Sequence, residues 1–195
     1  MTDSGARGER EAIDEELTVR RAGDGDLDAV ARVWHESASA MDGAAADVPS
    51  LDALRQRIDA ELEAGWELHV AMRGKRVVGM LAIKPDFATL DQIFVAPGEQ
   101  GRGVGTALLE TARRTLPTGF TLRMAASNDR PRRFYEKHGL KPLGEGMHPR
   151  TGVPVRFYGW NLLPEVEPSP QPSPTNPQGM VVPVGSDPYP GRKSS

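Results

Sequence analysis

Three glycines at alternate positions constrain this chain more than any other feature. Gly101, Gly103 and Gly105 follow an apolar, strand-like segment, "LDQIFV", and precede an amphipathic run that continues to Leu116. Glycine costs conformational entropy at the start of a helix, so three together indicate that something approaches the backbone closely. A strand, a glycine-rich turn and a helix in this order direct free backbone N–H groups toward an anion. The segment predicts a pyrophosphate site, with close helix packing as the alternative.

Two common nucleotide-binding patterns fit this segment poorly. A P-loop needs a Gly-Lys-Ser/Thr triplet four residues after a glycine, and none follows here. A dinucleotide fingerprint that begins at Gly101 would need its third glycine where Thr106 stands. The flanking strands also form hairpins rather than parallel crossovers. The glycines therefore indicate an anion site of another kind.

The composition predicts one folded domain between two tails. The chain has 195 residues, which is enough for one domain with a core. Residues 1–16 are polar and acidic, and nine of the 17 prolines lie from Pro164 onward. We expect disordered tails at 1–16 and 164–195 and a folded domain at 17–163.

Hydrophobic spacing predicts seven strands and four helices in the order β-α-α-β-β-β-α-β-α-β-β. Ser50 is the expected N-cap of the second helix, and Gly65 is expected to end it. The segments that carry the pattern most clearly are strands at 17–22, 66–72, 77–83, 89–95, 120–126 and 153–162, and helices at 27–38, 51–64, 104–116 and 131–139.

Two motifs make the chain resemble the GNAT superfamily of acyl-CoA N-acyltransferases. Residues 100–105, "QGRGVG", match the signature Q/R-x-x-G-x-G/A and follow the strand that ends in "IFVAP". The later segment "NDRPRRFYEKHGL" matches N-x-x-A-R-x-F-Y-E-K-x-G, with Pro131 in place of alanine, which suits a first helical turn. The resemblance implies an α/β (α+β) fold with a mainly antiparallel sheet of about seven strands and about four helices. A splayed strand pair would form the coenzyme cleft.

The resemblance also implies where acetyl-CoA binds. The amides of residues 101–106 would hold the coenzyme pyrophosphate, and the strand at 93–95 would contact the pantetheine amides where it separates from "FTLRMAA". A solvated surface arginine is the alternative for each arginine of the set, and a helix cap is the alternative for the asparagine. The expected coenzyme contacts are Ile93, Phe94, Val95, Gln100, Gly101, Arg102, Gly103, Val104, Gly105, Thr106, Asn128 and Arg132.

Acetyl transfer to an amine needs a neutral amine, a polarised carbonyl and a proton for the departing thiolate. The chain has no cysteine, so direct attack in a ternary complex is the simplest mechanism. Tyr135 is the expected general acid, since a phenol with a pKa of about 10 is protonated at neutral pH. The resemblance assigns the same role to this position. Because neighbouring residues on a helix point in different directions, we expect Phe134 to face the core and Tyr135 to face the cleft.

Asp91 is the expected general base, acting on the amine directly or through water. Strand alternation predicts that Asp91 shares a face with Ile93 and Val95, and an ion pair at a strand edge is the alternative role. The resemblance places the amine acceptor between the first two helices and the last hairpin. The expected acceptor-side residues are Trp34, His35, Asp42 and Tyr158.

Together, these features predict an N-acetyltransferase that uses acetyl-CoA and a primary amine, which is a small molecule, a peptide N-terminus or a lysine. A non-catalytic acyl-CoA-binding regulatory module is the alternative. The net charge of −3 argues against a general nucleic-acid binder, and no signal peptide or bilayer-length apolar run is present. We therefore expect a cytoplasmic monomer or homodimer with no metal, membrane or nucleic-acid partner.

Overall fold

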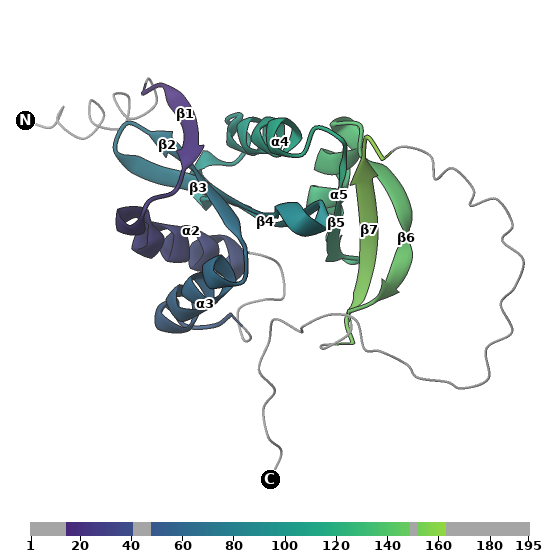
Figure 1. Cartoon of the computed structure of the whole chain (residues 1–195), viewed down its shortest axis with the longest axis horizontal. Coiled ribbons are helices and arrows are strands. Elements are labelled where there is room, and N and C mark those ends of the chain that lie inside the picture. The colour runs from purple at the N-terminus through teal and green to yellow at the C-terminus, as the bar shows by residue number, and fades with distance from the viewer. Residues whose placement is uncertain (1–14, 41–47, 149–151, 163–195) are drawn as a thin grey trace, which may run out of the picture.

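The computed structural model describes residues 15–40, 48–148 and 152–162. In this part of the chain, four α-helices pack on a seven-stranded sheet (Figure 1). The predicted tails lie outside the described residues, apart from Glu15 and Glu16. The strands are β1 Leu17–Arg21, β2 Glu67–Arg73, β3 Arg76–Lys84, β4 Thr89–Val95, β5 Phe120–Ala125, β6 Lys141–Met147 and β7 Pro154–Trp160, and the helices are α2 Leu27–Ser39, α3 Leu51–Glu63, α4 Val104–Thr115 and α5 Asp129–Lys137.

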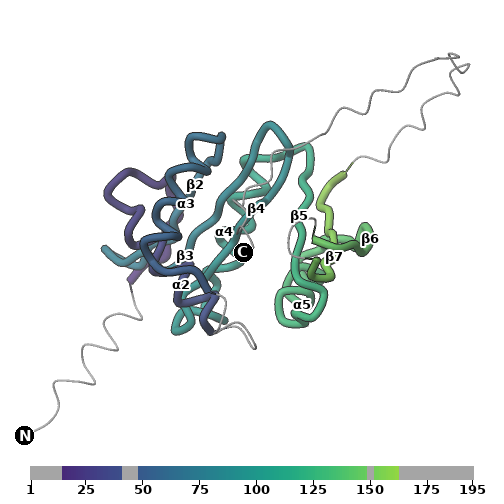
Figure 2. Tube along the Cα trace, turned by 90° about the horizontal axis from the view of Figure 1, so that it is seen from below, coloured from purple at the N-terminus to yellow at the C-terminus, as the bar shows by residue number. Residues whose placement is uncertain are grey.

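The sheet has the order β1-β2-β3-β4-β5-β7-β6. Neighbouring strands are antiparallel except β4 and β5, which run parallel and share the single Cα pair Thr89–Thr121. Beyond this pair β4 and β5 diverge, as Figure 2 shows. The expected mixed fold with a splayed strand pair is therefore confirmed, and so is the predicted order of elements.

Both faces of β2 and β3 are buried, which explains why these strands read as nearly continuous apolar runs. Helices α2 and α3 cover one face and α4 covers the opposite one (Figure 1). The first core contains Trp34, Ile58 and Met80. The second contains Leu108 of α4 and Tyr158 of β7. The glycine segment therefore begins a helix that is anchored across the sheet.

The helix ends follow the expected local signals. The Ser50 hydroxyl accepts a hydrogen bond from the Ala53 amide at 3.2 Å and caps α3, as predicted. Gly65, with φ of 96°, follows the end of this helix.

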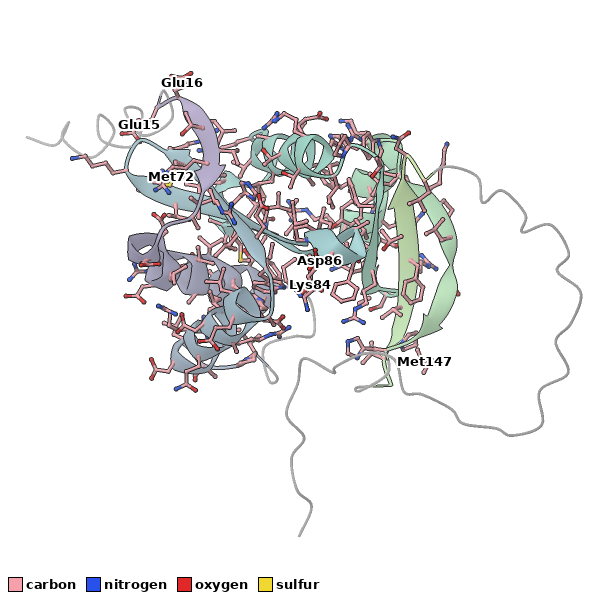
Figure 3. All side chains as sticks on the ribbon, viewed as in Figure 1. Glu15, Glu16, Met72, Lys84, Asp86 and Met147 are labelled. Carbon is pink, nitrogen blue, oxygen red and sulfur yellow. The ribbon has the colours of Figure 1, made fainter. Side chains whose placement is uncertain are left out.

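An ion pair connects α3 to the sheet at the C-terminal end of β3. Lys84 forms a 3.0 Å ion pair with the buried Glu61 of α3. Figure 3 labels Lys84 beside Asp86, where β3 passes into β4. This ion pair ties α3 to the sheet close to the start of the splayed strand.

Candidate functional site

A cavity of about 460 Å³ opens between β4 and α5. Its walls come from β4, the glycine segment, α5 and the last turn of α2. The structure brings nine of the twelve predicted coenzyme contacts to this cavity: Ile93, Phe94, Val95, Gln100, Gly101, Gly103, Gly105, Thr106 and Asn128.

The glycine segment presents free backbone donors to the cavity. Gly101 and Gly103 have left-handed φ angles of 81° and 84°, and Gly103 precedes α4 with no side-chain cap. The first backbone bond of the helix runs from the Ala107 amide to the Gly103 carbonyl at 3.0 Å. Among the described residues, the amides of Val104 and Gly105 have no backbone acceptor. These amides and the positive end of the helix therefore suit an anion.

The three glycines serve different purposes. A Cβ at Gly101 or Gly103 would meet no atom within 4 Å, so close packing does not explain these two positions. Their positive φ angles explain the choice, because side-chain-bearing residues rarely adopt them. A Cβ at Gly105 would lie 3.3 Å from Cζ of Phe134, so this glycine allows α4 to approach α5. Close helix packing, the predicted alternative, therefore applies to Gly105 and not to Gly101 or Gly103.

The edge of β4 adds backbone groups to the same cavity. The Ala96 amide donates to the Val78 carbonyl of β3 at 3.0 Å, so the alternation of a strand directs the backbone groups of Ile93 and Val95 away from β3. The Val95 carbonyl accepts hydrogen bonds from Ser37 Oγ at 2.7 Å and Gln100 Nε2 at 3.3 Å. Gln100 therefore ties the glycine segment to β4, while the amides of Ile93 and Val95 remain on the cavity side.

Tyr135 of α5 lines the cavity and is only 6% exposed. Its hydroxyl has no hydrogen-bond partner among the described residues, and burial raises the pKa of its phenol above the usual value. Phe134 also lines the cavity and is less buried than Tyr135. The expected division, with only Tyr135 in the cleft and Phe134 in the core, is wrong, because α5 turns both rings toward the space beside α4.

Asp91 lies on a different face from the one predicted. The register between β3 and β4 shifts so that Asp91 has no Cα partner on β3. Its carboxylate accepts a hydrogen bond from Trp66 Nε1 at 2.9 Å, and Trp66 belongs to the core beneath α2 and α3. Ile93 and Val95 pack on the opposite side, against the core beneath α4. The bulge therefore breaks the alternation on which the prediction depended.

Three predicted coenzyme contacts lie outside the cavity lining. Arg132 forms ion pairs with Asp129 at 3.0 Å and Glu136 at 3.5 Å, whereas Arg130 lines the cavity. The Val104 side chain is in the core, so only its backbone faces an anion site. The third, Arg102, lines a second, open hollow of about 1060 Å³.

The predicted acceptor residues do not come together. Trp34 is a core residue whose ring stacks on Phe94 at 5.6 Å, because the apolar face of α2 points to the sheet. Tyr158 is also buried, and its hydroxyl donates to Glu136 Oε1 at 2.9 Å. His35 lines the second hollow, and Asp42 lies outside the described residues. Trp34 and Tyr158 therefore act as packing residues here, which corrects the predicted acceptor role.

Several cavity residues were missed by the sequence analysis, among them Ser37, Lys137 and His138. Ser37 lies three residues after Trp34 on the buried face of α2, and a polar residue on such a face was an available signal. His138 contacts Thr106 through Nε2 at 3.1 Å. No spacing in the sequence predicts this contact, because it depends on how α4 and α5 pack together. Arg130 and Lys137 add positive charge to the cavity walls.

Two negative findings apply to the described ranges. No helix there is long and apolar enough to cross a membrane. Within the same ranges, no group of three His, Asp or Glu side chains is arranged to hold a metal ion.

Comparisons with known proteins agree with the fold. The family model described as "Acetyltransferase (GNAT) domain" matches residues 64–142. A Mycobacterium tuberculosis protein named "Probable N-acetyltransferase Rv2775" is 31% identical over 112 residues, which span 53% of this chain and 64% of the relative.

Solved structures share the fold at lower identity. A GNAT-family acetyltransferase from Bacillus cereus has a TM-score of 0.61 at 18% identity and covers 76% of this chain and 99% of its own. YncA from Salmonella typhimurium, solved with its cofactor acetyl-CoA, has a TM-score of 0.56 at 17% identity and covers 78% of this chain and 98% of its own. At these identities the likeness shows the fold alone.

Proposed function

Because residues 64–142 match the family model of a GNAT acetyltransferase domain, we propose that this chain is an N-acetyltransferase that transfers an acetyl group from acetyl-CoA to a primary amine. The observation that carries the proposal is the cavity between β4, the glycine segment and α5. The glycine segment with its free amides, the open edge of β4 and Tyr135 all line it. These are the groups that an acyl thioester with a pyrophosphate-linked arm requires.

In this proposal the amides at the start of α4 hold the coenzyme pyrophosphate, and the amides of Ile93 and Val95 hydrogen-bond the pantetheine arm. Asn128 and Arg130 lie on the wall formed by the start of α5. The positive charge of Arg130 and Lys137 supports the binding of phosphates. The chain thereby fixes the acyl group beside Tyr135, and positioning alone supplies much of the rate.

Acetyl-CoA supplies the acyl group as a thioester. The amine nitrogen forms a bond to the carbonyl carbon as the C–S bond breaks, and Tyr135 gives its phenolic proton to the departing sulfur. Burial raises the pKa of Tyr135, so the phenol holds this proton throughout the neutral range. The same desolvation also disfavours a free thiolate. The proton affinities of the phenol and of the departing sulfur therefore rise together.

Asp91 is the proposed base for the amine. Trp66 holds one carboxylate oxygen, Oδ2, at 2.9 Å, and among the described residues Oδ1 has no hydrogen-bond partner. Asp91 does not line the cavity, so we propose that it accepts the amine proton through a water molecule. The acceptor is a small molecule, a peptide N-terminus or a lysine side chain.

The experiment that tests the coenzyme site is calorimetric titration of acetyl-CoA, with NAD as the control ligand. We expect saturable binding by the unmodified chain. The variants Gly103→Asp and Gly103→Asn place side chains of equal size at the same left-handed position, where a Cβ meets nothing within 4 Å. Only the aspartate adds negative charge, so it should weaken binding at least about tenfold more than the asparagine.

Equal affinities in the two variants would place the pyrophosphate elsewhere. If the unmodified chain did not bind acetyl-CoA, the enzyme proposal would be wrong.

A further inference from the structure

His138 bridges α5 to the first turn of α4 inside the cavity wall. Its Nδ1 lies 2.8 Å from the Phe134 carbonyl oxygen, and its Nε2 lies 3.1 Å from Thr106 Oγ1. His138 and Thr106 both line the cavity. The imidazole therefore links the chain's second motif to the glycine segment through a single side chain.

The partner of Nδ1 fixes the tautomer. A carbonyl oxygen only accepts hydrogen bonds, so Nδ1 must carry a proton in every state of the ring. When the ring is neutral, Nε2 is an acceptor and the Thr106 hydroxyl must donate to it. When the ring is protonated, Nε2 donates to Thr106 Oγ1 instead. The charge on His138 therefore decides which way the Thr106 hydroxyl points its proton.

The direction of this hydroxyl matters because of its position. Thr106 is the third residue of α4, next to the amides that have no backbone acceptor among the described residues. An anion at this helix end is stabilised by donors and destabilised by lone pairs. Only protonated His138 releases the hydroxyl proton of Thr106 toward the cavity. The two states of the imidazole thus present opposite polarity to an anion.

Charged groups surround the imidazole. Arg113 of α4 donates to the His138 carbonyl and pairs with Glu110, and on α5 Lys137 and Arg130 line the same cavity. The positive charge of Lys137 and Arg130 favours an anion in this cavity.

We propose that His138 is a positioning residue of the coenzyme site that turns the Thr106 hydroxyl toward the coenzyme phosphates, so that coenzyme binding takes up a proton. This inference rests on the proposed function. Its consequence is that acetyl-CoA binds more tightly in mildly acidic solution than in mildly alkaline solution.

The test is calorimetric titration of acetyl-CoA between about pH 6 and pH 8, in buffers of different ionisation enthalpy, which counts the protons taken up. The phosphates of the coenzyme contribute equally in every variant, so the readout is the difference between variants. We expect the unmodified chain to bind as much as one proton more than the variants that lack the titrating ring or the hydroxyl. Its affinity for acetyl-CoA should fall by as much as about tenfold for each unit of pH increase.

Three variants test the relay, by which we mean the action of His138 through the Thr106 hydroxyl. His138→Gln and Thr106→Val should lower the proton uptake to a common baseline, since one removes the titrating ring and the other removes the hydroxyl. Thr106→Ser keeps the hydroxyl and should retain the uptake of the unmodified chain. Wild-type uptake in Thr106→Val would mean that the imidazole acts through its charge alone, which would overturn the relay. Wild-type uptake in His138→Gln would overturn it as well.

The failure of this inference and that of the proposed function are distinguishable. Binding without additional proton uptake overturns only the role of His138, whereas no binding at any pH overturns both. Nitrogen NMR provides a readout without ligand, because the chain has four histidines and His138→Gln assigns the relevant signal. We expect the Nδ1–H tautomer at alkaline pH, and the Nε2–H tautomer would overturn the inference.

Discussion

At the scale of single residues, the proposed chemistry depends on what surrounds Tyr135. The phenol is almost fully buried, yet its hydroxyl has no partner among the described residues. Because Tyr135 lines the cavity, a ligand there can complete the hydrogen bonding of this hydroxyl. The nearby Tyr158 differs, since its hydroxyl is satisfied by Glu136. Tyr135 is therefore the phenol that remains available for proton transfer.

Replacing Tyr135 with Phe keeps the ring and removes only the hydroxyl. We expect kcat to fall by about 10²–10⁴-fold, because a general acid contributes this much, while the Kd for acetyl-CoA changes little. Steady-state kinetics with an amine acceptor, combined with calorimetry, measure the two effects separately. A kcat within about threefold of the unmodified chain would exclude Tyr135 as the acid.

Asp91→Asn is the matched comparison for this substitution. The amide oxygen still accepts the Trp66 hydrogen bond but cannot take the amine proton. Its rate should recover at higher pH, where the amine deprotonates unaided, whereas the rate of Tyr135→Phe should not recover. If the unmodified chain binds acetyl-CoA but acetylates no amine, the non-catalytic binding module becomes the better interpretation.

At the scale of elements, the coenzyme site depends on how α4 sits on the sheet. Gly79 of β3 lies directly beneath the start of α4. A Cβ at this position would lie 2.8 Å from Cγ1 of Val104, 3.0 Å from Cδ1 of Leu108 and 3.2 Å from the Phe94 carbonyl. Because Gly79 has no side chain, the start of α4 with its free amides packs closely against β3.

Gly79→Ala should lower the free energy of unfolding by about 1–3 kcal/mol, since overpacking a core forces backbone shifts. It should also weaken acetyl-CoA binding, because Val104 begins the helix that carries the proposed anion site. Urea denaturation and calorimetry measure the two effects. The control is Gly98→Ala, where a Cβ meets no atom within 4 Å, and we expect a change below about 0.5 kcal/mol. Equal stability of the two variants would contradict the proposed packing.

At the scale of the whole molecule, helices cover both faces of the sheet, and one histidine of the sheet is buried. His69 of β2 is 8% exposed, and burial lowers its pKa, although the carboxylate of Glu67 at 3.4 Å acts in the opposite direction. The unfolded chain therefore takes up this proton at a higher pH than the folded chain does. Stability linked to His69 is present above about pH 6.5 and is lost as the pH falls through the folded-state pKa.

We expect the free energy of unfolding to decline below about pH 6.5, by at most about 1.4 kcal/mol per pH unit for this one group. Urea denaturation between about pH 5 and pH 8 measures the decline. His69→Gln should flatten the profile, whereas His35→Gln leaves His69 in place and should retain the decline. An unchanged slope in His69→Gln would assign the acid sensitivity to other groups.

The sequence predicted those features that depend on neighbouring residues in the chain. Apolar spacing gave the strands and helices, because core-facing side chains repeat with the period of each element. The glycine segment was recognisable because Gly101 and Gly103 adopt backbone angles that other residues avoid. Ser50 was recognised as a cap for the same kind of local reason.

Only the tertiary structure decided which side chains meet across elements. One extra residue in β4 moved Asp91 to the face opposite Ile93, and the docking of α2 made Trp34 part of the core. The contact between Thr106 and His138 exists because α4 and α5 pack together, although 32 residues separate them in the chain. Local patterns determine backbone conformation and periodicity, whereas register shifts and helix docking are set by packing over the whole domain. The sequence alone therefore determined the elements and the glycine segment, and the packed fold decided which side chains surround that segment.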